Sequence, residues 1–115
     1  MDAYNANPTS MRAALINFAN ICGKQHLLIL GDMRELGTAS EEEHRNILNL
    51  MKELGFKAAY LVGLNFCAYN DNPDWMTLEK VGDLCQYLES HPISGKTILV
   101  KGSNSIQLGK VLPLL

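Results

Sequence analysis

Cysteine is scarce in this sequence and is nowhere paired. The three cysteines, Cys22, Cys67 and Cys85, stand far apart with no C-x-x-C spacing. This pattern argues against a disulfide framework and against a zinc site of the usual spacing. No histidine lies at ligand spacing from another histidine or from a cysteine. We therefore expect a reducing, cytoplasmic setting and no metal site made from this chain's His and Cys.

Long apolar runs and an excess of one charge are also missing. No run reaches the roughly 18 apolar residues of a membrane span, and no charged-then-apolar leader is present. The 10 basic and 12 acidic residues give a formal net charge of −2, without a basic run. We therefore expect neither nucleic acid nor a membrane as a partner. At 115 residues, the chain fits a single domain, residues 1–115.

The common nucleotide and hydrolase motifs are absent. The sequence has no G-x-x-x-x-G-K-[ST] phosphate loop, no G-x-G-x-x-G after a strand and no G-x-S-x-G nucleophile elbow. A nucleotide enzyme that needs no other domain is therefore not expected.

Helical patterns and short apolar runs alternate along the chain. The expected helices cover 8–22, 40–54 and 79–89, with a helical turn after residue 64 and a helix or partial helix over 105–115. The expected strands cover 26–32, 58–63, 75–78 and 96–101. Such alternation predicts an α/β fold, a three-layer Rossmann-like domain with a mainly parallel sheet and helices on both faces.

Two of these helices carry start signals. Asn7 is a good N-cap, and Pro8 suits the first helical position. The run Ser40-Glu41-Glu42-Glu43 has the pattern of a capping box. Its acidic residues are better explained by the cap and the helix dipole than by catalysis.

Three polar segments stand where strands meet helices: DAYNANP (2–8), GDMRELG (31–37) and KGSNS (101–105). In parallel α/β sheets, ligands bind at the carboxyl ends of the strands. No strand precedes the first segment. We therefore expect a domain of a longer protein, cut at Asp2, with Met1 added at the cut.

The first segment can serve a nucleotide. Asp2 can accept hydrogen bonds from ribose hydroxyls, Tyr4 can lie against a purine, and the amides of Asn5 and Asn7 can meet amide or phosphate groups. The alternative is an Asx-rich turn that only caps the following helix.

The second and third segments each allow two interpretations. Asp32 is placed to contact a ligand, whereas Arg34 and Glu35 are as consistent with solvated or surface-paired side chains. In the third segment, a lysine, a glycine and a serine together suit a carboxylate or phosphate. The alternative there is a strand end followed by a helix capped by Ser103 or Ser105.

Together these segments resemble the C-terminal domain of the Mur ligases over essentially all 115 residues. The resemblance rests on DAYNANP with Ser10-Met11, on GDM with Glu35-Leu36-Gly37, on His44 in the next helix, and on LVKGS at 99–103. Within the family, the chain is most similar to members that add D-alanyl-D-alanine to UDP-N-acetylmuramoyl-tripeptide. Folylpolyglutamate synthases are related but favour an Asp-Ala-His-Asn-Pro arrangement in the first segment.

The resemblance implies one domain of a three-domain, ATP-dependent amide ligase of peptidoglycan synthesis, cytoplasmic and monomeric. In that family, ATP phosphorylates the tripeptide carboxylate, and the dipeptide amine attacks the acyl phosphate. Mg²⁺ offsets the phosphate charge. The family's central domain carries the phosphate loop and the metal ligands. No catalytic residue is therefore expected in this chain, which alone should be inactive.

The resemblance also implies which residues of this chain meet ligands. The nucleoside of ATP would contact Asp2, Tyr4, Asn5 and Asn7. The substrate would contact Asp32, Lys101, Gly102 and Ser103, with Lys101 holding the dipeptide carboxylate or a developing negative charge. The family often has Arg where this chain has Asn104, so no second cation is expected after the Lys-Gly-Ser sequence.

Two further alternatives belong to other classes. A phosphoacceptor receiver domain has Asp and Lys at strand ends, as Asp32 and Lys101 are expected to be, but needs an acidic pair where only Asp2 is available. A free-standing nucleotide-binding module of the same fold would bind ATP without any other domain.

Overall fold

The computed structural model describes residues 6–115. In this part of the chain, four strands form one parallel sheet in the order β3-β2-β1-β4. The strands are β1 (His26–Gly31), β2 (Ala59–Val62), β3 (Trp75–Leu78) and β4 (Thr97–Lys101). β1 is buried along nearly its whole length because it is central, whereas β4, at the edge of the described sheet, is half-buried.

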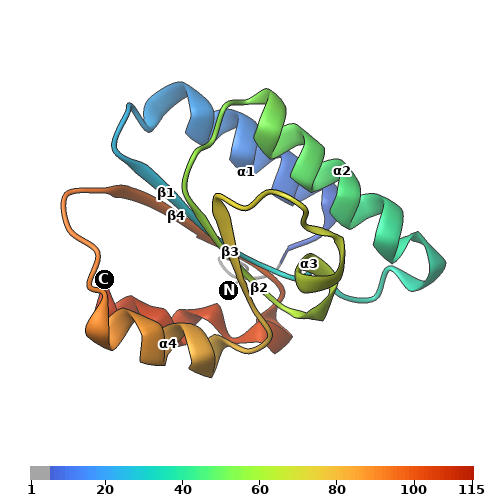
Figure 1. The fold of residues 1–115 in the computed structure, drawn as a ribbon. Coiled ribbons are helices and arrows are strands. Elements are labelled where there is room, and N and C mark those ends of the chain that lie inside the picture. Colours follow the sequence, from blue (N-terminus) through green and yellow to red (C-terminus); the bar gives the residue numbers. More distant parts are fainter. Residues whose placement is uncertain (1–5) are drawn as a thin grey trace.

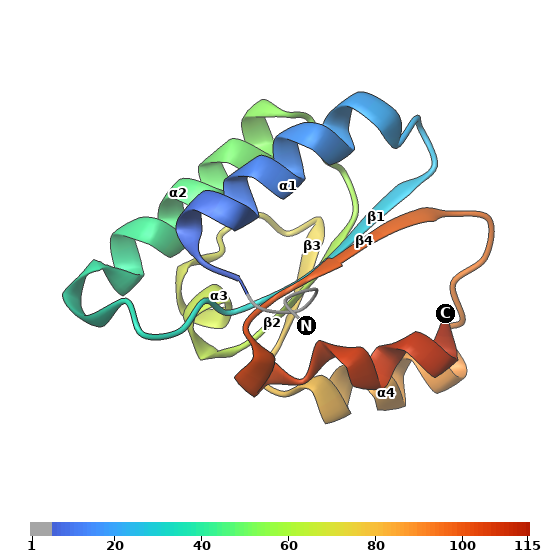
Figure 2. The ribbon, with the colours of Figure 1, turned by 180° about the vertical axis from the view of Figure 1, so that it is seen from behind.

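Helices cover both faces of the sheet (Figures 1 and 2). They are α1 (Pro8–Ile21), α2 (Ser40–Glu53), α3 (Leu64–Tyr69) and α4 (Val81–Ser90), with 3₁₀ turns η1 (Gly37–Ala39), η2 (Asn104–Ile106) and η3 (Leu108–Leu114). The helices α1 and α2 pack on one face, and α4 and η3 pack on the other. The predicted three-layer α/β fold is therefore confirmed.

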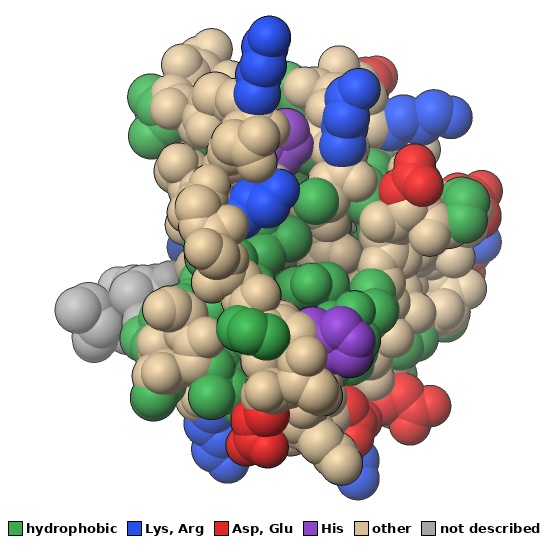
Figure 3. All heavy atoms as spheres, turned by 60° about the vertical axis from the view of Figure 1, so that its left-hand side comes forward, with side chains coloured by type: hydrophobic (Ala, Val, Ile, Leu, Met, Phe, Trp, Pro, Cys, Tyr) green, Lys and Arg blue, Asp and Glu red, His purple; other side chains and the backbone are tan. Residues whose placement is uncertain are grey.

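Separate apolar clusters fill the two layers. Met11, Leu15 and Met51 belong to the α1–α2 side, whereas Leu84 and Val111 belong to the α4–η3 side. At the end of the molecule where β1 and β4 begin, hydrophobic side chains remain visible in a hollow between the two layers (Figure 3). The C-terminal segment, where we expected a helix or a partial helix over 105–115, forms the 3₁₀ turns η2 and η3.

The predicted N-cap of α1 is confirmed, whereas the predicted capping box at the start of α2 is wrong. Asn7 Oδ1 accepts from the N–H of Ser10, and Ser10 Oγ accepts from the N–H of Asn7, which completes a capping box. Ser40, in contrast, is already helical because η1 runs directly into α2, and Ala39 occupies the N-cap position without a side-chain cap. The predicted box at Ser40 to Glu43 is therefore not formed.

Among the helices of residues 6–115, none is long and apolar enough to cross a bilayer.

Candidate functional site

The backbone of Asp32 joins the carboxyl ends of three strands. Its N–H donates to the carbonyl oxygen of Val62 at 2.9 Å, and its carbonyl oxygen accepts from the N–H of Ser103 at 3.1 Å. The ends of β1, β2 and β4 are thereby held at one edge. The second and third polar segments of the sequence come together here, as predicted from the parallel sheet.

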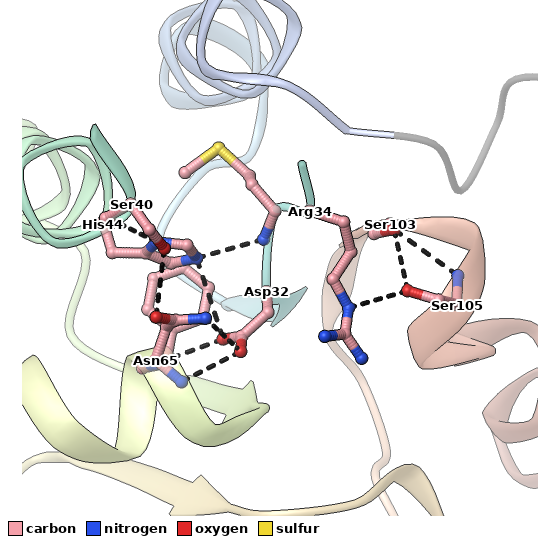
Figure 4. Close-up of polar contacts among 9 residues, drawn as sticks. Asp32, Arg34, Ser40, His44, Asn65, Ser103 and Ser105 are labelled. Atoms are coloured by element: carbon pink, nitrogen blue, oxygen red, sulfur yellow. Dashed lines mark hydrogen bonds and ion pairs between the residues drawn. The ribbon is translucent and has the colours of Figure 1, made fainter. Parts of the chain in front are cut away.

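The Asp32 carboxylate fixes the start of α3 (Figure 4). One oxygen, Oδ2, accepts from the backbone N–H and the side-chain Nδ2 of Asn65, each at 2.9 Å. The other, Oδ1, accepts from the N–H of Phe66 at 3.1 Å. Asp32 is only 2% exposed. Its carboxylate therefore satisfies an otherwise uncapped short helix, and the predicted substrate contact stays untested.

His44 supports the same edge from α2. Its Nε2 accepts from the N–H of Met33 at 3.0 Å, and its Nδ1 donates to the carbonyl oxygen of Ser40 at 2.7 Å. A ring that accepts at one nitrogen and donates at the other is neutral. Its Nε2 lies 3.8 Å from Asp32 Oδ1. Ser40 Oγ donates to Asn65 Oδ1, so the network closes on itself.

Glycines make room for this network. Gly63 has φ +128°, and a β-carbon there would overlap the carboxyl group of Asp32. A β-carbon on Gly102 would lie 2.9 Å from the Cα of Gly31 and 2.7 Å from a methyl of Leu108. Close approach of the ends of β1 and β4 therefore explains Gly102 without any ligand.

The Lys-Gly-Ser segment is also largely committed to the fold. Ser103 is 6% exposed, and its Oγ accepts from the N–H of Ser105, so Ser103 caps η2. The N–H of Ser103 is held by Asp32. These contacts match the alternative of a strand end with a serine cap. Lys101, half-buried at the end of β4, pairs in register with Leu30.

Beside Asp32 lies a groove of about 350 Å³, which we call the carboxyl-edge groove. Its lining includes Arg34, Leu64, Asn65, Glu79, Lys80 and Ile106. A second hollow of about 230 Å³ shares Arg34, Glu79, Lys80 and Ile106 and continues to Ser105 and Gln107. This groove could not be predicted from the sequence, because its residues follow all four strands of the described sheet.

Arg34 is anchored at this edge. Its Nε donates to Ser105 Oγ at 2.8 Å, so the side chain extends toward η2 (Figure 4). The next residue, Glu35, takes the left-handed backbone conformation with φ +62°, which turns the loop sharply. The exposed Arg34 thus contacts another of the polar segments, which is compatible with the alternative of a surface-paired side chain.

The other predicted contacts and chemistries have less structural evidence. Asp2, Tyr4 and Asn5 lie outside the described residues, whereas Asn7 is exposed and caps α1. Within residues 6–115, no group of three or more His, Cys, Asp and Glu side chains is arranged to hold a metal ion. Burial raises the pKa of the Cys67 thiol, which disfavours a nucleophilic thiolate there.

The comparisons with known proteins agree on one family. The family model described as "Mur ligase, glutamate ligase domain" matches residues 1–104. A ligase from Treponema pallidum, named UDP-N-acetylmuramoyl-tripeptide--D-alanyl-D-alanine ligase, is 36% identical over 100% of this chain and 27% of its own length. A Rickettsia prowazekii protein of the same name is 30% identical over 96% of the chain and 26% of its own.

Solved structures agree with this match. MurF from Acinetobacter baumannii superimposes with a TM-score of 0.79 at 26% identity, over 96% of this chain and 25% of that one. MurF from Thermotoga maritima in complex with ADP has a TM-score of 0.75 at 18% identity, over 98% and 26%, and shows the fold alone. This chain spans about a quarter of these proteins. The chain belongs to the Mur ligase family and matches its glutamate ligase domain.

Proposed function

We propose that this chain is the C-terminal domain of a three-domain, ATP-dependent ligase that adds D-alanyl-D-alanine to UDP-N-acetylmuramoyl-tripeptide in peptidoglycan precursor synthesis. The observation that carries the proposal is the match of the whole chain, at 36% identity, to a protein named for that reaction. The same name recurs for relatives from several other bacteria. The longer enzyme would be cytoplasmic and monomeric.

In this enzyme, the domain closes over ATP held mainly by the central domain. When bound with Mg²⁺, ATP supplies the phosphoryl group that activates the tripeptide carboxylate. Asp2, Tyr4, Asn5 and Asn7 would contact the nucleoside. Of these, only Asn7 is described, and its side-chain oxygen already accepts from Ser10. Its amide nitrogen is thus the group left to meet a nucleotide.

The carboxyl edge of the sheet faces the substrates in this proposal. The buried network of Asp32, His44 and Asn65 keeps the loops after β1 and β2 in place, so they need no rearrangement when substrate arrives. Lys101, at the end of β4, supplies a cation for negative charge that develops during the attack on the acyl phosphate.

The identity of the amine tests the proposal. The longer protein, incubated with ATP, Mg²⁺ and UDP-N-acetylmuramoyl-tripeptide, should form a product whose mass contains the added dipeptide only when D-alanyl-D-alanine is present. A folylpolyglutamate synthase-like enzyme would instead add glutamate to a folate. Ligation of glutamate to folate, with no reaction of the dipeptide, would contradict the proposal.

A receiver-like role for Asp32 is less well supported. A phosphoacceptor carboxylate needs an accessible oxygen that can attack phosphorus. Both oxygens of Asp32 accept hydrogen bonds, and the residue is 2% exposed. Incubation with acetyl phosphate and Mg²⁺ should leave Asp32 unmodified. A stable acyl phosphate on Asp32 would favour the receiver alternative.

A further inference from the structure

A pocket opens at the end of the sheet opposite to the carboxyl edge, where β1 and β2 begin. The helices α1 and α2 both end beside it, and the loops that follow them form its rim. Its volume of about 470 Å³ is within the range of small-molecule sites and exceeds that of the carboxyl-edge groove. We call it the amino-edge pocket, and it is lined by Ala19, residues 22–24, His26 and residues 54–57.

His26 joins the two loops of the rim. Its Nδ1 donates to the carbonyl oxygen of Gly23 at 3.2 Å, and its Nε2 accepts from the backbone N–H of Lys57 at 3.2 Å. The first partner belongs to the loop after α1 and the second to the loop after α2, so the ring holds the two loops together. The imidazole also meets the ring of Phe56 edge-on, with 5.3 Å between the centroids. The rim is therefore formed before any ligand arrives.

The inner wall of the amino-edge pocket is apolar. Phe56 is buried, and its ring stacks on that of Phe18 with 6.0 Å between the centroids. Half-buried Ala19 and Leu54 complete the wall from α1 and from the end of α2. An apolar group that packs here removes the remaining apolar surface of the wall from water. The wall therefore suits a flat apolar group such as an aromatic ring.

The rim of the pocket is basic. Lys24 and Lys57 line it from the two loops and are exposed, and the lining within residues 6–115 contains no acidic residue. In the same part of the chain, neither ammonium group forms an ion pair or a hydrogen bond. Figure 3 views this end of the molecule, where basic side chains project beside hydrophobic ones. The two positive charges are therefore available to an anion.

The helix ends do not cancel this charge. The carbonyl ends of α1 and α2 each carry the equivalent of about half a negative charge. The two lysines carry two positive charges, so the pocket keeps a net positive charge of about one. The contribution of α2 is reduced further, because the N–H groups of Gly55 and Phe56 already donate to carbonyl oxygens of its last turn. Compensation of the helix dipoles therefore accounts for only part of the positive charge.

We propose that the amino-edge pocket binds a small organic anion with a flat apolar body, such as an aromatic carboxylate. The apolar body packs on the wall formed by Ala19, Leu54 and Phe56. The anionic group pairs with the ammonium groups of Lys24 and Lys57. This site is separate from the substrates in the proposed function, because it lies at the opposite ends of the strands.

The test titrates the 115-residue chain with 2-naphthoate and follows its amide signals by NMR. Without ligand, these signals should be well dispersed, as in a folded chain. Binding should shift the signals of residues 22–26 and 54–57 and leave those of the carboxyl edge unchanged. 2-Naphthamide has the same apolar body without the charge and should bind about fivefold or more weakly. Acetate, which has the charge without the apolar body, should also bind more weakly than 2-naphthoate.

Variants of the lining test the role of each part. Lys24→Ala and Lys57→Ala should each raise the dissociation constant of 2-naphthoate about twofold to fivefold, as expected for exposed ion pairs, and leave that of 2-naphthamide nearly unchanged. Lys52→Ala is the matched control, because Lys52 is exposed in the last turn of α2 and lies outside the lining. It should leave both constants unchanged. Ala19→Leu, which fills part of the pocket, should weaken the binding of both compounds.

The longer protein should give the same order of dissociation constants in titration calorimetry, whether or not it ligates D-alanyl-D-alanine. Equal affinity of the wild type and of the variant without both Lys24 and Lys57 would overturn the proposal. So would shifts at the carboxyl edge instead, or no shift by 2-naphthoate up to its solubility limit. If a polyglutamate peptide shifts the signals of residues 22–26 and 54–57 and 2-naphthoate does not, an acidic protein segment is the better occupant and the proposal is wrong.

Discussion

At the scale of single residues, Gly63 is the position least tolerant of change. A β-carbon there would overlap the Asp32 carboxyl group, and φ +128° is unfavourable for any L side chain. Gly63→Ala should destabilise the chain by about 3 kcal/mol or more, through backbone strain and the displaced carboxylate. Urea unfolding of the purified chain measures this loss.

Gly82→Ala is the matched control for this substitution. Gly82 lies in α4, and nothing is within 4 Å of the β-carbon position. The alanine should be neutral or stabilising, by up to about 1 kcal/mol, because it restricts the unfolded chain. Equal stabilities of the two variants would show that the space around Asp32 is not as tight as described.

Lys101 is the residue whose role in catalysis is most directly testable. It lies outside the carboxyl-edge groove and is half-buried at the end of β4. In the longer protein, Lys101→Ala should lower kcat by about a hundredfold with a smaller change in the KM for the dipeptide, as expected for a group that acts on developing charge. Steady-state kinetics that match the wild type would remove Lys101 from the site.

At the scale of elements, the start of α1 separates two roles for Asn7. Its side chain caps the helix by accepting from Ser10 at 2.9 Å. Asn7→Ala should cost about 1 kcal/mol of stability, whereas Asn7→Asp, which keeps the acceptor, should cost less. Asn20→Ala, an exposed change within α1, is the control and should not destabilise.

The same variants test the nucleotide contact. Asn7→Asp keeps the cap but removes the amide nitrogen. In the longer protein, a raised KM for ATP in Asn7→Asp would favour a nucleotide role in addition to the cap. If Asn7→Asp has wild-type kinetics and only Asn7→Ala is affected, the residue serves the helix alone.

The packing of β2 against α4 predicts a dependence on alkaline pH. Burial, and to a lesser degree Tyr87, raises the pKa of Tyr60, whose ring lies 5.8 Å from that of Tyr87. The unfolded chain therefore loses this proton first, and stability falls as pH rises above about 10. Tyr60→Phe cannot lose a proton there. Its stability relative to wild type should increase between about pH 8 and pH 11 in urea unfolding. A difference that does not change with pH would contradict this.

Most elements could be predicted from the sequence because their signals are local. The apolar run of β1 is buried on both sides, and Asn7 with Pro8 starts α1 as expected. The capping box at Ser40 failed because the preceding 3₁₀ turn, which continues directly into α2, has no strong sequence signal. The commitment of Asp32 could not be predicted, since its partners Asn65 and Phe66 lie more than 30 positions away, behind a turn at Gly63.

At the scale of the whole molecule, the chain matches about a quarter of its relatives' lengths. In the proposed function, its residues at the carboxyl edge position and bind the substrates. The phosphate loop expected for ATP is not in its sequence. We therefore expect that the chain folds as a domain but acts only together with the rest of a ligase.

Phosphate release from ATP in the presence of UDP-N-acetylmuramoyl-tripeptide and D-alanyl-D-alanine tests this expectation. The longer protein should release phosphate only when both substrates are present. The 115-residue chain alone should release no phosphate, although its circular dichroism spectrum should show that it is folded. The longer protein without this domain should lose the activity. Substrate-dependent phosphate release by the chain alone, or undiminished release without it, would contradict the account.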